Sequence, residues 1–148
     1  MTNNDIQPKP YLFVYGTLRQ GFSNPMARLM QQQCSLIGSG SMDGSLYDVG
    51  QYPAACLGGR PGALIKGEIY DLPDNFNPLI KQLDKYEDCD TTYERLLLEI
   101  EGEDGQVYHS WAYIYCLPTQ NLKQIVSGDY IRYIENQSEE RLTLIPKL

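Results

Sequence analysis

Glu87 occupies a position where the helical pattern calls for an apolar side chain. Phe76, Leu79, Ile80 and Leu83 follow the spacing i, i+3, i+4 and i+7, which is typical of a helix with one apolar face. The next position on that face is Glu87. Burial of a carboxylate raises its pKa, and the negative end of the helix dipole acts in the same direction. Such a group suits general acid and base catalysis near neutral pH, so Glu87 is the first candidate catalytic residue.

An ordinary structural explanation of Glu87 stays open. Residues 88–91, Asp-Cys-Asp-Thr, have the composition of a loop. If the helix ends before Glu87, its side chain turns to water instead. Asp84 and Glu94 are less specific candidates, because Asp84 lies off the apolar face and Glu94 is expected to point to solvent from a strand.

A second candidate is the end of the first apolar segment, where Tyr15, Gly16, Thr17 and Leu18 follow one another. Consecutive backbone N–H groups at a sharp turn form a nest for a carboxylate or an oxyanion, and Gly16 permits a ligand to approach closely. A plain strand end explains the same residues. Arg19 either clamps a substrate carboxylate or makes a structural ion pair.

Cysteine and histidine offer a weaker alternative, a thiol hydrolase that pairs a Cys with His109. His109 is the only histidine, and the cysteines form no C-x-x-C pair, so no metal site is expected. Tyr93 and Tyr130 are candidates to supply hydroxyl groups, although residue type alone separates them little from the other ten tyrosines. The four cysteines are Cys34, Cys56, Cys89 and Cys116.

The elements that hold these residues follow from periodicity and from turn residues. Strands outnumber helices, which predicts an α+β fold with a curved sheet or a small barrel flanked by a few helices. Ser23 or Asn24 is expected to cap the first helix, and Asp74 or Asn75 the second. Strands are expected at 11–17, 36–37, 44–47, 52–57 and 63–72, with a hairpin of 93–101 and 107–116. Helices are expected at 25–33, 76–86 and 129–135, followed by a tail that adds a strand or docks loosely.

Composition narrows the possible partners. The 148 residues suggest one domain, over residues 11–148, after a disordered or extended lead-in at residues 1–10. The net charge of −7 and the scattered basic residues argue against nucleic acid and anionic membranes. The N-terminus lacks the pattern of a signal peptide, and no apolar run is long enough to cross a bilayer. Free thiols in the cytoplasm are the simplest interpretation.

Five short motifs, in order, resemble the γ-glutamylcyclotransferase-like superfamily. The resemblance covers about residues 11–135 and is closest to the branch of avirulence-induced-gene-like proteins and γ-glutamylamine cyclotransferases. The motifs are Y-G-T-L-R at 15–19, Y-P-A at 52–54, G-E-I-Y-D-L at 67–72, L-D-K-Y-E at 83–87 and Y-E-R at 93–95.

The resemblance implies a small mixed β-barrel with flanking helices and a cavity between the Y-G-T-L loop and Glu87. On that pattern Glu87 is the general acid and base, and the substrate is a small γ-glutamyl compound that cyclises to 5-oxoproline without metal or cofactor. Residues 15–19, Tyr93 and Tyr130 are then the substrate-binding residues. Asp88 departs from the family, which usually has glycine there. The departure keeps open a binding module without turnover, and the extra charge of Asp88 is expected to raise the pKa of Glu87 further, unless the loop is built differently.

Overall fold

The computed structural model describes the backbone of residues 9–144 and the side chains of residues 9–137. Five strands close into a barrel in the order β1-β5-β2-β6-β7. Every neighbouring pair is antiparallel except β1 and β7, which run parallel, so the barrel is mixed, as expected. These strands are β1 (Tyr11–Val14), β2 (Ser35–Asp43), β5 (Leu64–Asp71), β6 (Tyr93–Gly102) and β7 (Val107–Tyr115).

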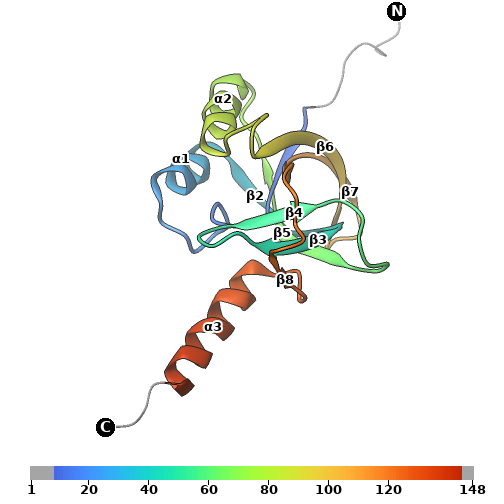
Figure 1. Cartoon of the computed structure of the whole chain (residues 1–148). Helices are drawn as coiled ribbons and strands as arrows, with labels where there is room; N and C mark the ends of the chain where they lie inside the picture. Colours follow the sequence, from blue (N-terminus) through green and yellow to red (C-terminus); the bar gives the residue numbers. More distant parts are fainter. Residues whose placement is uncertain (1–8, 145–148) are drawn as a thin grey trace, which may run out of the picture.

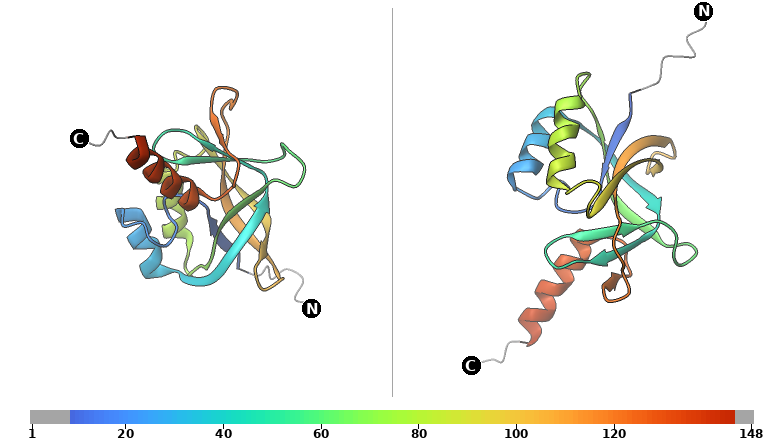
Figure 2. Two further views of the ribbon diagram at one scale, coloured as in Figure 1. Left: turned by 90° about the horizontal axis from the view of Figure 1, so that it is seen from below. Right: turned by 45° about the horizontal axis from the view of Figure 1, so that its top comes forward.

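A second sheet of three strands lies beside the barrel in the order β4-β3-β8. Helices α1 and α2 lie side by side against one flank of the barrel, whereas α3 projects away on another side (Figures 1 and 2). The strands are β3 (Ser45–Asp48), β4 (Pro53–Cys56) and β8 (Lys123–Ile125). The helices are α1 (Pro25–Gln33), α2 (Asn77–Tyr86) and α3 (Tyr130–Leu144).

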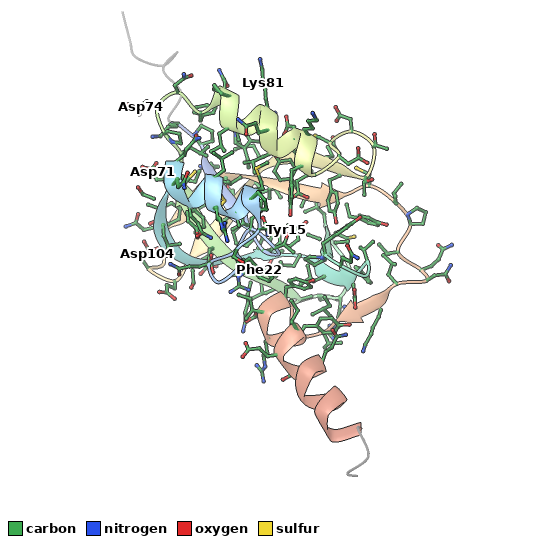
Figure 3. All side chains as sticks on the ribbon, turned by 90° about the vertical axis from the view of Figure 1, so that its left-hand side faces the viewer. Tyr15, Phe22, Asp71, Asp74, Lys81 and Asp104 are labelled. Carbon is green, nitrogen blue, oxygen red and sulfur yellow. The ribbon has the colours of Figure 1, made fainter. Side chains whose placement is uncertain are left out.

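Strand β1 is apolar on both faces because each face has its own core to fill. Leu12 and Val14 join the cluster formed with α1 and α2. Phe13 and Tyr15 alternate with them and join the cluster shared by the barrel strands and the second sheet. Figure 3 shows Tyr15 in the interior, whereas Lys81 points away from α2 into solvent. The first apolar segment is therefore packed between two cores.

Glycine permits β1 and β5 to pack closely at one position. A Cβ atom on Gly67 would lie 2.3 Å from the carbonyl oxygen of Val14 and 2.7 Å from the Phe13 ring. No side chain fits there without moving the start of the turn at residues 15–19. The glycine of the G-E-I-Y-D-L motif thus fixes where β1 ends.

Several element predictions are confirmed and others are wrong. Asn24 caps α1 by accepting from the Ala27 N–H at 2.8 Å, as expected. For α2 the expected cap is wrong, since Phe76 is the N-cap and no side chain caps the helix. Strand β1 ends at Val14 instead of residue 17, and β8 was not predicted.

The C-terminal prediction is also wrong, because α3 continues through the residues expected to form a tail and ends at Leu144 instead of Glu135. Residues 1–8 and 145–148 lie outside the described residues. The lead-in is therefore untested over residues 1–8, and the single domain over residues 11–148 stays a prediction. No helix of the described part is long and apolar enough to cross a membrane.

Candidate active site

Glu87 lies at the point where α2 ends. The helix stops at Tyr86, and Glu87 is the C-cap residue, with its backbone N–H donating to the carbonyl of Leu83 at 2.9 Å. Leu79, Ile80 and Leu83 are buried in the cluster below, so the apolar face of α2 sets the rotation of the helix about its axis. That rotation directs Glu87 into a cavity instead of into solvent.

Burial raises the pKa of Glu87 from 4.5 to about 7. No other cause contributes to this shift, so Asp88 is not the reason for it. Asp88 instead adopts a φ of 52°, a left-handed conformation that glycine accepts more easily than other residues. The backbone at this position is therefore one for which a glycine is well suited.

The cavity in front of Glu87 has an inner and an outer part. The inner part, of about 30 Å³, is bounded by Glu87, the turn at residues 15–18, the Tyr52-Pro53 segment, Tyr93 and Tyr113. The outer part, of about 240 Å³, is lined by Thr17, Tyr52, Tyr86, Glu87, Asp88, Thr92 and Tyr93. Glu87, Thr17, Tyr52 and Tyr93 line both parts, so the two are adjacent.

The turn after β1 borders the inner cavity. The N–H of Arg19 donates to the carbonyl of Gly16 at 3.0 Å and closes the turn. The side chain of Asn24 donates to the carbonyl of Thr17 at 2.8 Å. Among the described residues, the N–H groups of Gly16, Thr17 and Leu18 have no acceptor. They are therefore available to an oxyanion or a carboxylate bound in the cavity.

The hydroxyl group of Tyr15 is already occupied. It donates to the carbonyl of Tyr113 on β7 at 2.5 Å. Burial first, and then the charge of Glu87, raise the pKa of Tyr15 well above its ordinary value. The Tyr15 hydroxyl therefore joins the end of β1 to β7 within the barrel, and the backbone and ring of Tyr15 are left to line the cavity.

Tyr93 and Tyr130 both bind the backbone of the segment that carries Tyr52. Tyr93 donates to the carbonyl of Pro53 at 2.8 Å, and Tyr130 donates to the carbonyl of Gln51 at 3.2 Å. Tyr93 also lines both parts of the cavity, whereas Tyr130 lines neither. Tyr93 therefore borders the cavity, whereas Tyr130 lies outside it and contacts the segment that carries Tyr52.

Gly16 is needed for protein packing. A Cβ atom there would lie 2.7 Å from Cγ of Pro53 and 2.8 Å from its Cδ. Such distances are too short for any real Cβ contact, so one wall would have to shift. The Y-G-T-L and Y-P-A motifs are therefore two surfaces in contact with each other.

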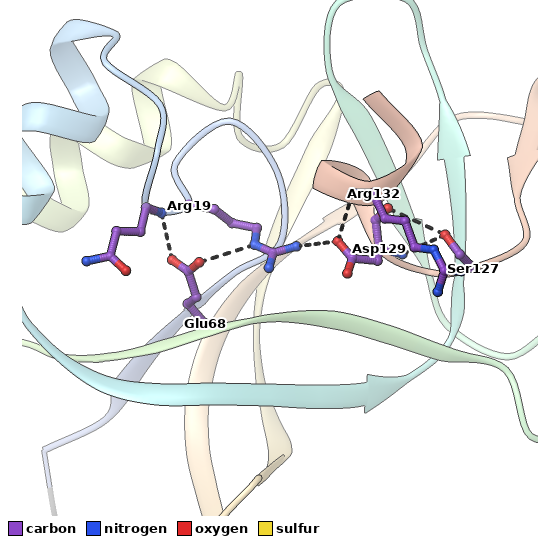
Figure 4. A network of polar contacts seen from close by, with 6 residues as sticks. Arg19, Glu68, Ser127, Asp129 and Arg132 are labelled. Carbon is purple, nitrogen blue, oxygen red and sulfur yellow. Dashed lines mark hydrogen bonds and ion pairs between the residues drawn. The ribbon is translucent and has the colours of Figure 1, made fainter. Parts of the chain in front are cut away.

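Arg19 lies outside both parts of the cavity and braces the turn (Figure 4). Its Nη1 contacts Oδ1 of Asp129 at 2.8 Å, and its Nε contacts Oε2 of Glu68 at 3.4 Å. Glu68 also accepts from the backbone N–H of Gln20 at 2.7 Å and from the Tyr70 hydroxyl at 3.1 Å. This network joins the turn, β5 and the start of α3, so the structural ion pair is the alternative for Arg19 that the structure supports.

Asp84, one of the less specific candidates from the sequence, lies outside the cavity and supports part of its wall. Its carboxylate accepts from Arg95 Nε at 2.8 Å and from the Tyr113 hydroxyl at 2.7 Å. Tyr113 borders the inner cavity, so its hydrogen bond to Asp84 fixes the position of one side chain of the cavity wall. In the sequence, Asp84 and Arg95 belong to the L-D-K-Y-E and Y-E-R motifs, and no local pattern links these two residues. Glu94 is exposed on β6, as expected.

The thiol alternative has no support in the structure. His109 is exposed on β7, and its ion-pair partner is Glu99 at 3.7 Å. Burial raises the pKa of all four thiols, that of Cys34 to about 11, which opposes thiolate formation. Across the described residues no group of three His, Cys, Asp or Glu side chains is placed to hold a metal ion. The cytoplasmic location stays a prediction.

Comparison with known proteins identifies relatives of the whole fold. The family described as "Gamma-glutamyl cyclotransferase, AIG2-like" matches residues 12–132. Gamma-L-glutamyl-butirosin B gamma-glutamyl cyclotransferase from Niallia circulans is 33% identical over 110 residues, covering 72% of this chain and 67% of that protein. The gamma-glutamylcyclotransferase family protein YtfP from Escherichia coli K12 is 34% identical over 123 residues, covering 81% of this chain and 95% of YtfP.

Solved structures agree. The solution structure of YtfP from Escherichia coli has a TM-score of 0.59 at 31% identity and covers 84% of this chain and 98% of that one. The crystal structure of an AIG2-like protein from Mus musculus has a TM-score of 0.65 at 25% identity and covers 82% and 87%. The prediction of a cyclotransferase-like barrel is confirmed, as is that of an enzyme family. The chain belongs to the γ-glutamylcyclotransferase family, in its AIG2-like branch.

Proposed function

We propose that this chain cyclises a γ-glutamyl amine or a γ-glutamyl amino acid to 5-oxoproline, with Glu87 as the proton carrier. The observation that supports this most is that Glu87, with a pKa of about 7, shares one small cavity with the N–H groups of the 15–18 turn. The relative from Niallia circulans is named for removing a γ-glutamyl group, which supports the same class of substrate here.

The proposed reaction needs one proton carrier and one oxyanion site. The free α-amine of the γ-glutamyl group attacks its own γ-carbonyl carbon, forming the ring C–N bond, and passes a proton to the Glu87 carboxylate. The N–H groups of Gly16, Thr17 and Leu18 stabilise the oxygen that becomes negative. The old amide C–N bond then breaks, and Glu87 returns the proton to the departing nitrogen. No water is consumed.

Two features of the reaction suit a small cavity. The attack is intramolecular and closes a five-membered ring, so the enzyme only has to select the folded conformer of the substrate. One carboxylate with a pKa near neutrality serves as base in the first half and as acid in the second.

The proposal is tested by incubating the protein with γ-glutamyl amines and γ-glutamyl amino acids and measuring 5-oxoproline by mass spectrometry. Glu87→Gln should lose at least about a hundredfold in kcat, the range that general acid and base catalysis contributes. Glu94→Gln, which removes an exposed glutamate on β6, is the matched control. Full activity in Glu87→Gln would overturn the assignment of Glu87.

A second experiment, calorimetry, separates turnover from binding alone. Calorimetry with 5-oxoproline and with the γ-glutamyl compounds reports occupancy of the cavity whether or not product forms. Binding without any 5-oxoproline from any compound would show a non-catalytic binding module of this fold and would overturn the proposed activity.

A further inference from the structure

The outer part of the cavity lies where a departing amine has to be. If the reacting γ-carbonyl lies between Glu87 and the 15–18 turn, the inner part receives the reacting end of the γ-glutamyl head. The other side of the amide bond then extends past Glu87 into the outer part, which is several times larger. This placement rests on the proposed function, and the outer lining then decides which amine fits.

The charges around the cavity are all of one sign. Glu87 and Asp88 are the only ionisable acids or bases, other than tyrosines, among the residues that line its two parts, and neither part is lined by a Lys or an Arg. The nearby Arg95 is occupied by Asp84 at 2.8 Å. An amino acid as leaving group would bring a carboxylate beside Asp88 with no cation to receive it. The outer cavity therefore disfavours γ-glutamyl amino acids.

Asp88 is an exposed carboxylate whose position is nevertheless fixed. Its Oδ2 accepts from the Thr92 hydroxyl at 2.9 Å, and its carbonyl oxygen accepts from the N–H groups of Thr91 at 3.2 Å and of Thr92 at 3.0 Å. Within the described part of the chain, no Lys, Arg or His forms an ion pair with Asp88. One of its oxygens is thus free to accept from a ligand.

Two tyrosine rings complete the outer cavity. Tyr52 and Tyr86 line the outer part and are 42% and 43% exposed. The Tyr86 hydroxyl is tied to the Thr17 hydroxyl at 3.2 Å, so this ring is anchored to the turn. Aromatic rings attract cations through their faces, and here they stand beside an unpaired carboxylate.

We propose that the outer cavity is a subsite for a leaving amine that carries a second positive charge, such as an alkyl diamine, and that Asp88 pairs with that charge between Tyr52 and Tyr86. The preferred substrates are then mono-γ-glutamyl diamines, in which one nitrogen leaves and the other is held as an ammonium. Asp88 is the residue that determines this specificity.

The main test compares two compounds of the same length, and a third compound extends the comparison. Mono-γ-glutamyl 1,4-diaminobutane carries the terminal ammonium, and γ-glutamyl n-pentylamine has a methyl group in its place. An exposed ion pair with an aromatic neighbour is expected to give the diamine about a five- to tenfold higher kcat/KM. Because screening weakens this attraction, the preference should shrink in about 0.5 M salt. γ-Glutamyl 4-aminobutyrate, with a terminal carboxylate, should be the poorest of the three.

Variants assign the preference to Asp88. Asp88→Asn should bring the kcat/KM ratio of diamine to pentylamine close to one. Asp90→Asn removes a neighbouring exposed carboxylate that does not line the cavity, and it should keep the wild-type ratio. Equal kcat/KM for both compounds in the wild type, or an unchanged ratio in Asp88→Asn, would overturn the proposal.

A binding measurement keeps this inference separate from the proposed reaction. Calorimetry on Glu87→Gln compares the Kd values of the two compounds without turnover. A five- to tenfold preference for the diamine there, with no 5-oxoproline from the wild type, would support the subsite and overturn the reaction. Turnover of both compounds with equal Kd values would support the reaction and overturn the subsite.

Discussion

The buried carboxylate of Glu87 should destabilise the fold at alkaline pH, so Glu87→Gln is expected to be more stable than the wild type there. A carboxylate whose pKa is raised by folding binds its proton more tightly in the folded chain than in the unfolded chain. Stability from this group is therefore complete below the ordinary pKa of 4.5 and is lost as the pH rises to about 7. Glutamine has nearly the same shape and no charge to bury.

The size of the effect follows from the two pKa values, 4.5 unfolded and about 7 folded. At about pH 5.5 the unfolded chain has released most of this proton and the folded chain has kept it, which lowers the free energy of unfolding by about 1 kcal/mol. At about pH 8.5 both states have released it, and the loss reaches about 3 kcal/mol. The advantage of Glu87→Gln should thus grow by about 2 kcal/mol over this range.

Urea unfolding of the wild type, Glu87→Gln and Glu94→Gln at these two pH values measures the effect. Glu94→Gln removes the same charge from the surface and controls for the net charge of the protein. A stability difference between Glu87→Gln and the wild type that stays constant with pH would refute the conclusion that Glu87 is buried in the folded chain.

Three other predictions concern the same site. If Glu87 must be ionised to accept the first proton, kcat/KM should rise about tenfold per pH unit below about pH 7 and level off above it; a flat pH–rate profile would exclude this role. Arg19→Ala should cost about 3 kcal/mol in urea unfolding, because it leaves Glu68 buried without its cation, whereas Arg132→Ala, at an exposed position, should cost little. Gly16→Ala should raise KM several-fold by displacing Pro53, and adding Pro53→Ala should restore part of the loss; no recovery in the double variant would show that the 2.7 Å contact is not the cause.

The parts of the site that lie close together in sequence were predictable. The apolar face of residues 76–83 is a local pattern, and it points to Glu87 because the helix continues to the residue before it. The turn at residues 15–18 follows directly from a strand buried on both faces. These two features lie about seventy residues apart, and only the resemblance to a known family predicted that they share a cavity.

The remainder depends on contacts that no local pattern encodes. Arg19 reaches Glu68 and Asp129, which lie 49 and 110 residues further along the chain. Strand β8 has only three residues and exists because β3 offers it a free edge. A strand was expected only at residues 36–37, whereas β2 spans Ser35–Asp43. The exposed Leu36 and Ile37 and the shift in register between Leu36 and Gly38 explain why its sequence lacks the alternation of a regular strand.

None of the described side chains of α3 lines the cavity, yet residues 129–130 at the start of the helix hold both of the walls that face Glu87. Asp129, just before the helix, binds Arg19 of the turn, and Tyr130, its first residue, binds the carbonyl of Gln51 beside Tyr52. The rest of α3 projects away from the barrel (Figure 1). A tilt of this helix would move the turn and the Tyr52 segment together and change the width of the cavity mouth from a distance.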